Sequence, residues 1–106
     1  MAYLLTREGK KQSNVHRLVP GETITVGRTP TNHIVIKDER CSRNHAELFH
    51  SGEGWCYRDL DSRNGSFLKG ERINTDTLIQ VGDTIRIGEV YLQLVEDVSE
   101  VFSDGS

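Results

Sequence analysis

Three polar stretches of this 106-residue chain carry the side chains best suited to hold an anion. Arginine presents a planar fork of N–H donors that matches the oxygens of a phosphate or a carboxylate. A serine hydroxyl and an asparagine amide add donors of their own. These groups predict a small anion-binding site. The stretches are residues 26–32 with Arg28, residues 40–45 with Ser42 and Arg43, and residues 61–66 with Arg63 and Asn64.

Each of these residues also has an ordinary structural explanation. A single arginine such as Arg28 is most often a solvated surface residue. His45 begins an apolar run, where a histidine held by hydrogen bonds is more common than a ligand or a catalyst. Asn64-Gly65 between two β-type runs is a strong turn signal in its own right. The argument for a binding site therefore rests on the three stretches together.

The charge of the chain is unevenly distributed. The whole chain has a net charge of −3, with 13 basic and 16 acidic residues. Between Gly27 and His45, four basic residues face two acidic ones, so this segment is net positive. If the polar stretches share one end of the fold, they form a basic patch in an acidic protein. Such a patch suits one localised anion better than a nucleic acid or an anionic membrane.

The segments that must position these stretches are short and β-like. Apolar residues alternate with polar ones, and turn signals recur about every ten residues, which is typical of β-sandwiches. No window keeps the apolar spacing of an amphipathic helix. We therefore predict an all-β sandwich, whose loops gather at its two ends. The expected strands are 3–6, 15–19, 22–26, 34–36, 46–50, 55–60, 77–79, 84–87 and 90–95.

One domain is predicted for residues 1–96, followed by an acidic, serine-rich tail or linker at 97–106. The sequence has no apolar run long enough to span a membrane and no secretory signal, which favours the cytoplasm. Cys41 and Cys56 are too few for a disulfide framework, and we expect both to be reduced and partly buried.

Three other kinds of function are disfavoured by the sequence. Ser42, His45 and Asp59 are the residue types of a hydrolase triad, but no nucleophile elbow is present. Cys41, His45 and Cys56 lack the paired spacing of a zinc site. Aromatic residues make up only 7% of the chain, and no basic–aromatic stripe runs along it, which argues against nucleic-acid binding. We therefore expect no enzymatic activity, no cofactor and no metal.

Taken in order and at these separations, the motifs resemble those of the forkhead-associated (FHA) domain. The residues that carry the resemblance are Gly27-Arg28, Ser42-Arg43-Asn44-His45 and Asn64-Gly65-Ser66. The resemblance extends from about residue 3 to residue 96. It implies an eleven-stranded β-sandwich of two twisted, mainly antiparallel sheets, like those of FHA and SMAD domains. It also implies a signalling module of a larger multidomain protein, which recruits a partner containing phosphothreonine.

The resemblance also implies roles for individual residues. Arg28 and Ser42 are expected to contact the phosphate, and Arg43 to contact the phosphate or the peptide. Asn64 is expected to bond the peptide backbone, while the site is supported structurally by Gly27, His45 and Gly65.

Arg63 departs from the smaller threonine or serine of many relatives. It either adds a phosphate contact, reads an acidic residue of the peptide, or crowds the site. The alternative function is an FHA fold that binds a protein partner independently of phosphate.

Overall fold

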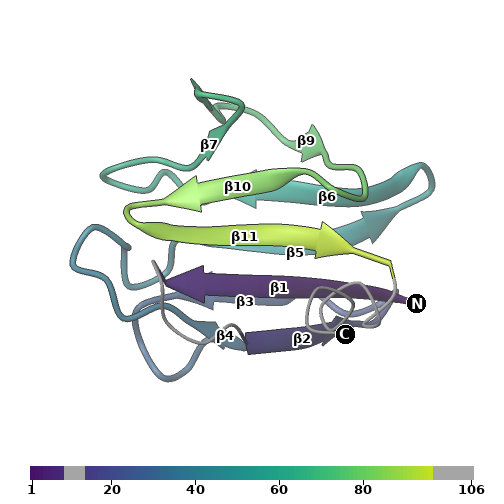
Figure 1. Ribbon diagram of the computed structural model, residues 1–106, viewed down its shortest axis with the longest axis horizontal. Coiled ribbons are helices and arrows are strands. Elements are labelled where there is room, and N and C mark those ends of the chain that lie inside the picture. The colour runs from purple at the N-terminus through teal and green to yellow at the C-terminus, as the bar shows by residue number, and fades with distance from the viewer. Residues whose placement is uncertain (9–13, 97–106) are drawn as a thin grey trace, which may run out of the picture.

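The computed structural model describes residues 1–8 and 14–96, which form eleven strands and no helix (Figure 1). The all-β prediction is confirmed, and the predicted strands all occur, with small shifts at their ends. The strands are β1 (Ala2–Glu8), β2 (Asn14–Leu18), β3 (Ile24–Gly27), β4 (Ile34–Val35), β5 (Ala46–Ser51), β6 (Gly54–Asp59), β7 (Phe67–Leu68), β8 (Glu71–Arg72), β9 (Thr77–Leu78), β10 (Thr84–Ile87) and β11 (Val90–Val95).

The strands form two sheets that pack face to face. The six-stranded sheet has the order β2-β1-β11-β10-β7-β8, and the five-stranded sheet has the order β4-β3-β5-β6-β9. All neighbouring strands with an assigned register are antiparallel, except β3 and β4, which are parallel. Strands β7 and β8 had no counterpart among the predicted runs, because, unlike the equally short β4 and β9, neither contains a β-branched residue.

The core lies between the sheets and is built by alternation along the strands. Leu48 and Tyr57 face it from the five-stranded sheet, while Ile87 and Leu92 face it from the six-stranded sheet, and all four side chains are inaccessible to solvent. Successive side chains of a strand point to opposite faces, so each of these strands also presents residues to solvent. The alternating pattern of the sequence thus fixes which face of each sheet is buried.

The first and last strands lie side by side in the six-stranded sheet. Tyr3 of β1 is the register partner of Val95 of β11, so the start of one strand adjoins the end of the other. The tail or linker predicted for 97–106 lies outside the described residues. None of the described segments forms a helix long and apolar enough to cross a membrane.

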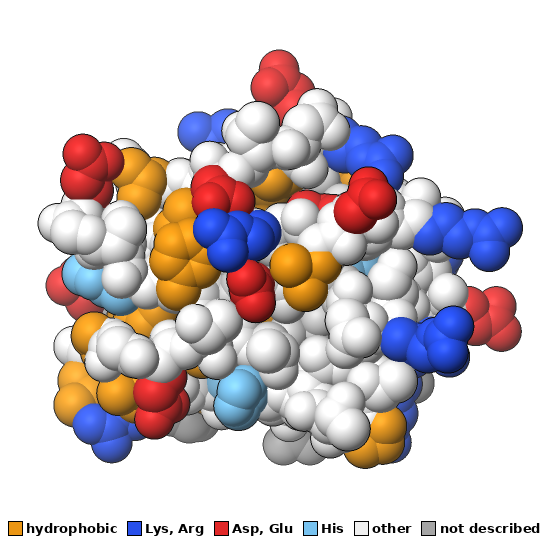
Figure 2. Space-filling model, turned by 180° about the vertical axis from the view of Figure 1, so that it is seen from behind, with side chains coloured by type: hydrophobic (Ala, Val, Ile, Leu, Met, Phe, Trp, Pro, Cys, Tyr) orange, Lys and Arg blue, Asp and Glu red, His pale blue; other side chains and the backbone are white. Residues whose placement is uncertain are grey.

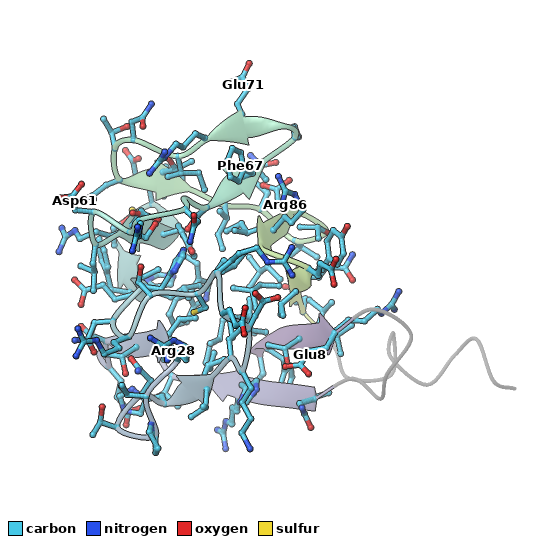
Figure 3. All side chains as sticks on the ribbon, turned by 90° about the vertical axis from the view of Figure 1, so that its left-hand side faces the viewer. Glu8, Arg28, Asp61, Phe67, Glu71 and Arg86 are labelled. Carbon is cyan, nitrogen blue, oxygen red and sulfur yellow. The ribbon has the colours of Figure 1, made fainter. Side chains whose placement is uncertain are left out.

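The polar loops gather at the opposite end of the sandwich. Figure 3 looks onto this end, where Arg28 and Asp61 lie on neighbouring loops in front of the strands. The turn that joins β10 to β11 reaches the same end (Figure 1). The two sheets therefore act as a frame that brings sequence-distant loops together.

We predict that the buried face of β11 contributes strongly to stability. Leu92→Ala removes a fully buried side chain and should lower the free energy of unfolding by about 2–5 kcal/mol. The neighbouring Gln93→Ala changes the outer face and should cost less than about 0.5 kcal/mol. Urea titration of both variants measures the difference. Equal effects would contradict this assignment of the two faces.

Candidate functional site

Three loops meet at this end of the sandwich. The first loop (28–33) joins β3 to β4, the second (36–45) joins β4 to β5, and the third (60–66) joins β6 to β7. The backbone N–H of Arg28 donates to the carbonyl oxygen of Ser42 over 3.0 Å. The first and second loops therefore run against each other through main-chain hydrogen bonds.

The close approach of these two loops requires a glycine at position 27. A Cβ atom there would lie 2.2 Å from the carbonyl oxygen of Arg43 and 2.6 Å from Nδ2 of Asn32. The same Nδ2 donates hydrogen bonds to the carbonyl oxygens of Arg43, over 2.9 Å, and Thr29, over 3.0 Å. Because Gly27 has no side chain, the amide of Asn32 fits beside it and links the first loop to the second by hydrogen bonds.

Arg28 lies at the start of the first loop and is exposed. Its Nε donates to the carbonyl oxygen of Cys41 over 3.1 Å, which orients the guanidinium group. No described residue accepts a hydrogen bond from its two terminal nitrogens. The donor fork is thus held from one side and remains available to a ligand on the other.

His45 joins the second loop to the third. Its Nδ1 accepts the backbone N–H of Ser42 over 2.9 Å, so in the neutral ring the proton sits on Nε2. Nε2 then donates to the carbonyl oxygen of Gly65 over 3.1 Å. The side chain is completely buried, and this burial lowers the pKa of His45. Both ring nitrogens are therefore used to position the loops.

The third loop places Arg63 and Asn64 beside Ser42. The backbone N–H of Arg63 donates to Oγ of Ser42 over 3.1 Å, which leaves the serine hydroxyl hydrogen for another acceptor. Nδ2 of Asn64 donates to the carbonyl oxygen of Arg40 over 3.1 Å. The amide oxygen of Asn64 takes no hydrogen bond from a described residue. The second and third loops thus form one polar surface.

A buried carboxylate organises the base of the third loop. Asp59 accepts hydrogen bonds from the backbone N–H and the hydroxyl of Ser62 and from the hydroxyl of Ser66. Burial by itself raises the pKa of Asp59, but these hydrogen bonds outweigh it and hold the pKa below its usual value. Ser66 also bonds the hydroxyl of the buried Tyr57 over 2.6 Å. An ionised Asp59 therefore fixes the loop to the core.

The second loop is anchored on its other side by Asp38. This carboxylate accepts from Nε of Arg40 over 3.0 Å and from the backbone N–H of Glu89 over 3.2 Å. Although partial burial of Asp38 opposes ionisation, the contacts with Arg40 keep the pKa of this carboxyl below its usual value. The loop is thereby tied to the turn between β10 and β11.

Positive charge remains at the surface of this end. Arg28, Arg43 and Arg63 are exposed, and within the described part of the chain none of them forms an ion pair with a carboxylate. Figure 2 shows Lys and Arg side chains along the edge of the molecule that carries the loops. The arrangement offers N–H donors and charge to a compact anion.

The geometry does not assemble the hydrolase or the metal site weighed from the sequence. His45 accepts the backbone N–H of Ser42 rather than its hydroxyl, so the serine is not activated as a nucleophile. Cys41 and Cys56 are both free and buried, and burial raises the pKa of the Cys41 thiol to about 11. Residues 1–8 and 14–96 hold no cluster of three or more side chains suited to a metal ion.

The sequence assigns no role to several residues that shape the site. Asn32 fastens the first two loops, Asp38 anchors the second, and Ser62 folds back on Asp59. No role in supporting the loops is predicted for Asp59 from the sequence. A usable signal was present in Asp59-Leu60-Asp61-Ser62, because an aspartate often accepts hydrogen bonds from residues two or three positions later. The role of Asn32 depends on its hydrogen bond to Arg43, which is 11 residues away, so the neighbouring sequence does not indicate it.

Comparisons with known proteins decide the family. A family model described as the FHA domain matches residues 24–88, which include all three loops. The chain belongs to the FHA-domain family. The FHA domain-containing protein FhaB of Mycobacterium tuberculosis is 28% identical over 92 residues, covering 87% of this chain and 59% of that relative. This chain therefore spans little more than half the length of that relative.

Solved structures support the same family. The FHA domain of the CT664 protein from Chlamydia trachomatis matches with a TM-score of 0.83 and 26% identity, covering 91% of this chain and 97% of that chain. Mycobacterium tuberculosis EmbR, in complex with a low-affinity phosphopeptide, matches with a TM-score of 0.74 and 28% identity, covering 89% of this chain and 24% of that chain. The fold of this FHA domain is thus shared with the CT664 domain and with part of EmbR.

We predict that Gly27→Ala disrupts the contact between the first two loops. The added methyl would overlap the backbone of Arg43, and the FHA domain should lose about 2 kcal/mol of unfolding free energy. Gly52→Ala is the matched control, since Gly52 is exposed and a Cβ there meets nothing within 4 Å. Thermal unfolding of both variants provides the measurement, and similar losses for the two would disprove the steric argument.

We also predict that protonation of His45 weakens the fold. Its folded-state pKa lies below the unfolded value of about 6.5, so its contribution is complete above that pH and is lost on acidification. Between pH 7 and 5.5, the unfolding free energy should fall by at most about 1.4 kcal/mol per pH unit from this group.

His45→Gln should flatten this pH dependence, while His50→Gln, at an exposed position, should leave it unchanged. Denaturant titrations across the pH range give the slopes. A slope that is the same in His45→Gln and the parent chain would exclude His45 as its source.

Proposed function

We propose that this FHA domain binds a phosphothreonine-containing segment of a protein partner through the three loops. The observation that carries the proposal is the convergence of the Arg28 fork, the Ser42 hydroxyl and the Asn64 amide on one surface. Hydrogen bonds of the second loop to the first and to the third hold this surface together. The EmbR complex with a phosphopeptide supports the proposal by likeness.

Phosphate chemistry fits the groups that the loops present. A phosphothreonine carries about −1.5 to −2 charges at neutral pH and three strong acceptor oxygens. Arg28 supplies two donors in a planar fork, and the hydroxyl of Ser42 supplies a third. Arg43 and Arg63 add positive charge without a competing carboxylate in the described residues. No metal ion is needed to neutralise the ligand.

The remaining groups bind or align the peptide. The free amide oxygen of Asn64 accepts a backbone N–H of the ligand, and the exposed guanidinium of Arg43 contacts the phosphate or the chain beside it. The backbone of Arg63 is already held by Ser42, so its side chain extends from a fixed point at the rim. We assign to it a contact with an acidic residue downstream of the phosphothreonine.

We further propose that the domain acts by recruitment and carries out no chemistry of its own. Its host would be a longer signalling protein, in keeping with the greater length of FhaB. We also propose that it acts in the cytoplasm, where a kinase and ATP are available to write the mark that it reads. Residues 1–96 form the recruiting unit.

Titration against synthetic phosphothreonine peptides tests the proposal. Arg28→Ala should reduce affinity at least about a hundredfold, because charge-assisted hydrogen bonds to phosphate are lost. Arg17→Ala, an exposed arginine on β2, is the matched control and should bind normally. Unphosphorylated peptide should not bind. Phosphoserine peptide should bind about fourfold more weakly, because one methyl group is worth about 0.8 kcal/mol.

Two outcomes would overturn the proposal. Binding of the peptides with equal affinity to Arg28→Ala and the parent chain would exclude the loop site. No binding to any phosphothreonine peptide in a degenerate library, by a domain shown to be folded, would favour the alternative of a phosphate-independent interaction domain.

A further inference from the structure

The outer face of the six-stranded sheet carries a row of alternating basic and aromatic side chains. Register pairs connect five neighbouring strands in turn: Arg7 with Tyr91, Tyr91 with Arg86, Arg86 with Phe67, and Phe67 with Arg72. Register partners in antiparallel strands point to the same face of a sheet. These five residues form what we call the arginine–aromatic row.

The side chains of the row lie away from the core. Tyr91 is 43% exposed, and Arg7 and Arg72 are exposed as well. The guanidinium of Arg86 covers the ring of Phe67, with 4.6 Å from its central carbon to the ring centroid. Figure 3 shows Phe67 and Arg86 together on the side of the six-stranded sheet, next to the loop end.

This row is not apparent in the sequence. No basic–aromatic stripe runs along the chain, because the five residues are scattered between positions 7 and 91. Pairing of the strands brings them into line across the sheet. A search along the sequence therefore misses a pattern that is perpendicular to the strands.

The positive charge of the row is not neutralised locally. Within residues 1–8 and 14–96, no carboxylate forms an ion pair with Arg7, Arg72 or Arg86. Arg86 donates instead to the carbonyl oxygen of Gly88, and Arg72 donates to that of Ser62 in the third loop. Uncompensated charge on an otherwise acidic protein is a basis for attracting an acidic partner.

A hollow adjoins the row on the same face. It has a volume of about 380 Å³ and is lined by Leu5, Arg7, Thr84, Tyr91 and Gln93. Leu5 is the apolar member of this lining and is only 6% exposed. Two residues of the row, Arg7 and Tyr91, therefore also border a space that can receive a side chain of a bound peptide.

We propose that the arginine–aromatic row binds an extended acidic segment of a protein partner, with a carboxylate at every third residue. The three arginines occupy every second strand, so their backbones are spaced by about 9.6 Å. A polyproline-type chain repeats every three residues and about 9.3 Å, which matches this spacing. The interaction uses no phosphate and goes beyond the function proposed for the loops.

A single-stranded nucleic acid is the less suitable occupant. Base stacking needs a free aromatic face, and one face of Phe67 is already covered by Arg86. The net charge of −3 also opposes a long polyanion more than it opposes a short acidic peptide. The row thus fits a few carboxylates at a fixed spacing.

The test uses a synthetic peptide of three Glu-Pro-Pro repeats, titrated into isotope-labelled protein and followed by NMR chemical-shift changes. The affected residues should include Arg7, Tyr91 and Arg86. The double variant Arg7→Gln, Arg86→Gln should weaken binding about tenfold, and Arg7→Gln alone about threefold. Arg17→Gln is the matched control, since Arg17 pairs with Tyr3 on the same sheet but outside the row.

A comparison peptide with its three glutamates adjacent should bind more weakly, because its carboxylates cannot reach all three arginines. The proposal is overturned if the two peptides bind equally, or if Arg17→Gln has the same effect as Arg7→Gln. A short oligothymidylate that shifts the same residues and binds more tightly than the peptide would overturn it in favour of nucleic acid.

The loop site is measured separately. Arg28→Ala should leave binding of the acidic peptide unchanged, and Arg7→Gln should leave binding of a phosphothreonine peptide unchanged. Loss of the acidic peptide in Arg28→Ala would mean that it binds at the loops, which would overturn the proposal for the row.

Discussion

The hydrogen bonds of the buried His45 ring are the interaction on which the loop end depends. One nitrogen accepts from the backbone of Ser42 and the other donates to the backbone of Gly65, so one neutral side chain joins two loops. Each such bond is worth about 0.5–1.5 kcal/mol net, whereas a buried group left without a partner costs about 1–3 kcal/mol. The neutral ring is therefore the state in which the second and third loops are held together.

The other contacts of the loop end complete this framework. Gly27 and Asn32 bring the first loop against the second, and Asp59 fixes the base of the third to the core. These contacts use backbone groups and buried side chains, which leaves Arg28 and Ser42 directed outward. A surface that is ordered before binding loses less conformational entropy when it takes a ligand. Rigidity at this end would therefore favour binding of the phosphopeptide proposed for the site.

Much of this arrangement was predictable because it depends on local patterns. Alternation along β5, β6, β10 and β11 was sufficient to locate those strands, and ordered motifs at Arg28, Ser42 and Asn64 identified the family. The short strands β7 and β8 left no pattern, since their pairing is imposed by neighbours. Contacts such as that of Asn32 with Arg43, and the row from Arg7 to Arg72, depend on strand order. They become visible only when residues far apart in the sequence are placed side by side.

The neighbouring positions of Tyr3 and Val95 have a consequence for how such a domain is incorporated into proteins. The start of β1 and the end of β11 are adjacent points of one sheet. The domain can therefore be inserted into a surface turn of a host protein without separating the two ends of that turn. The three loops of the candidate site lie at the far end of the sandwich, away from these two points (Figure 1). The same geometry would let the ends be joined and new ones opened elsewhere, a circular permutation that preserves every strand pairing.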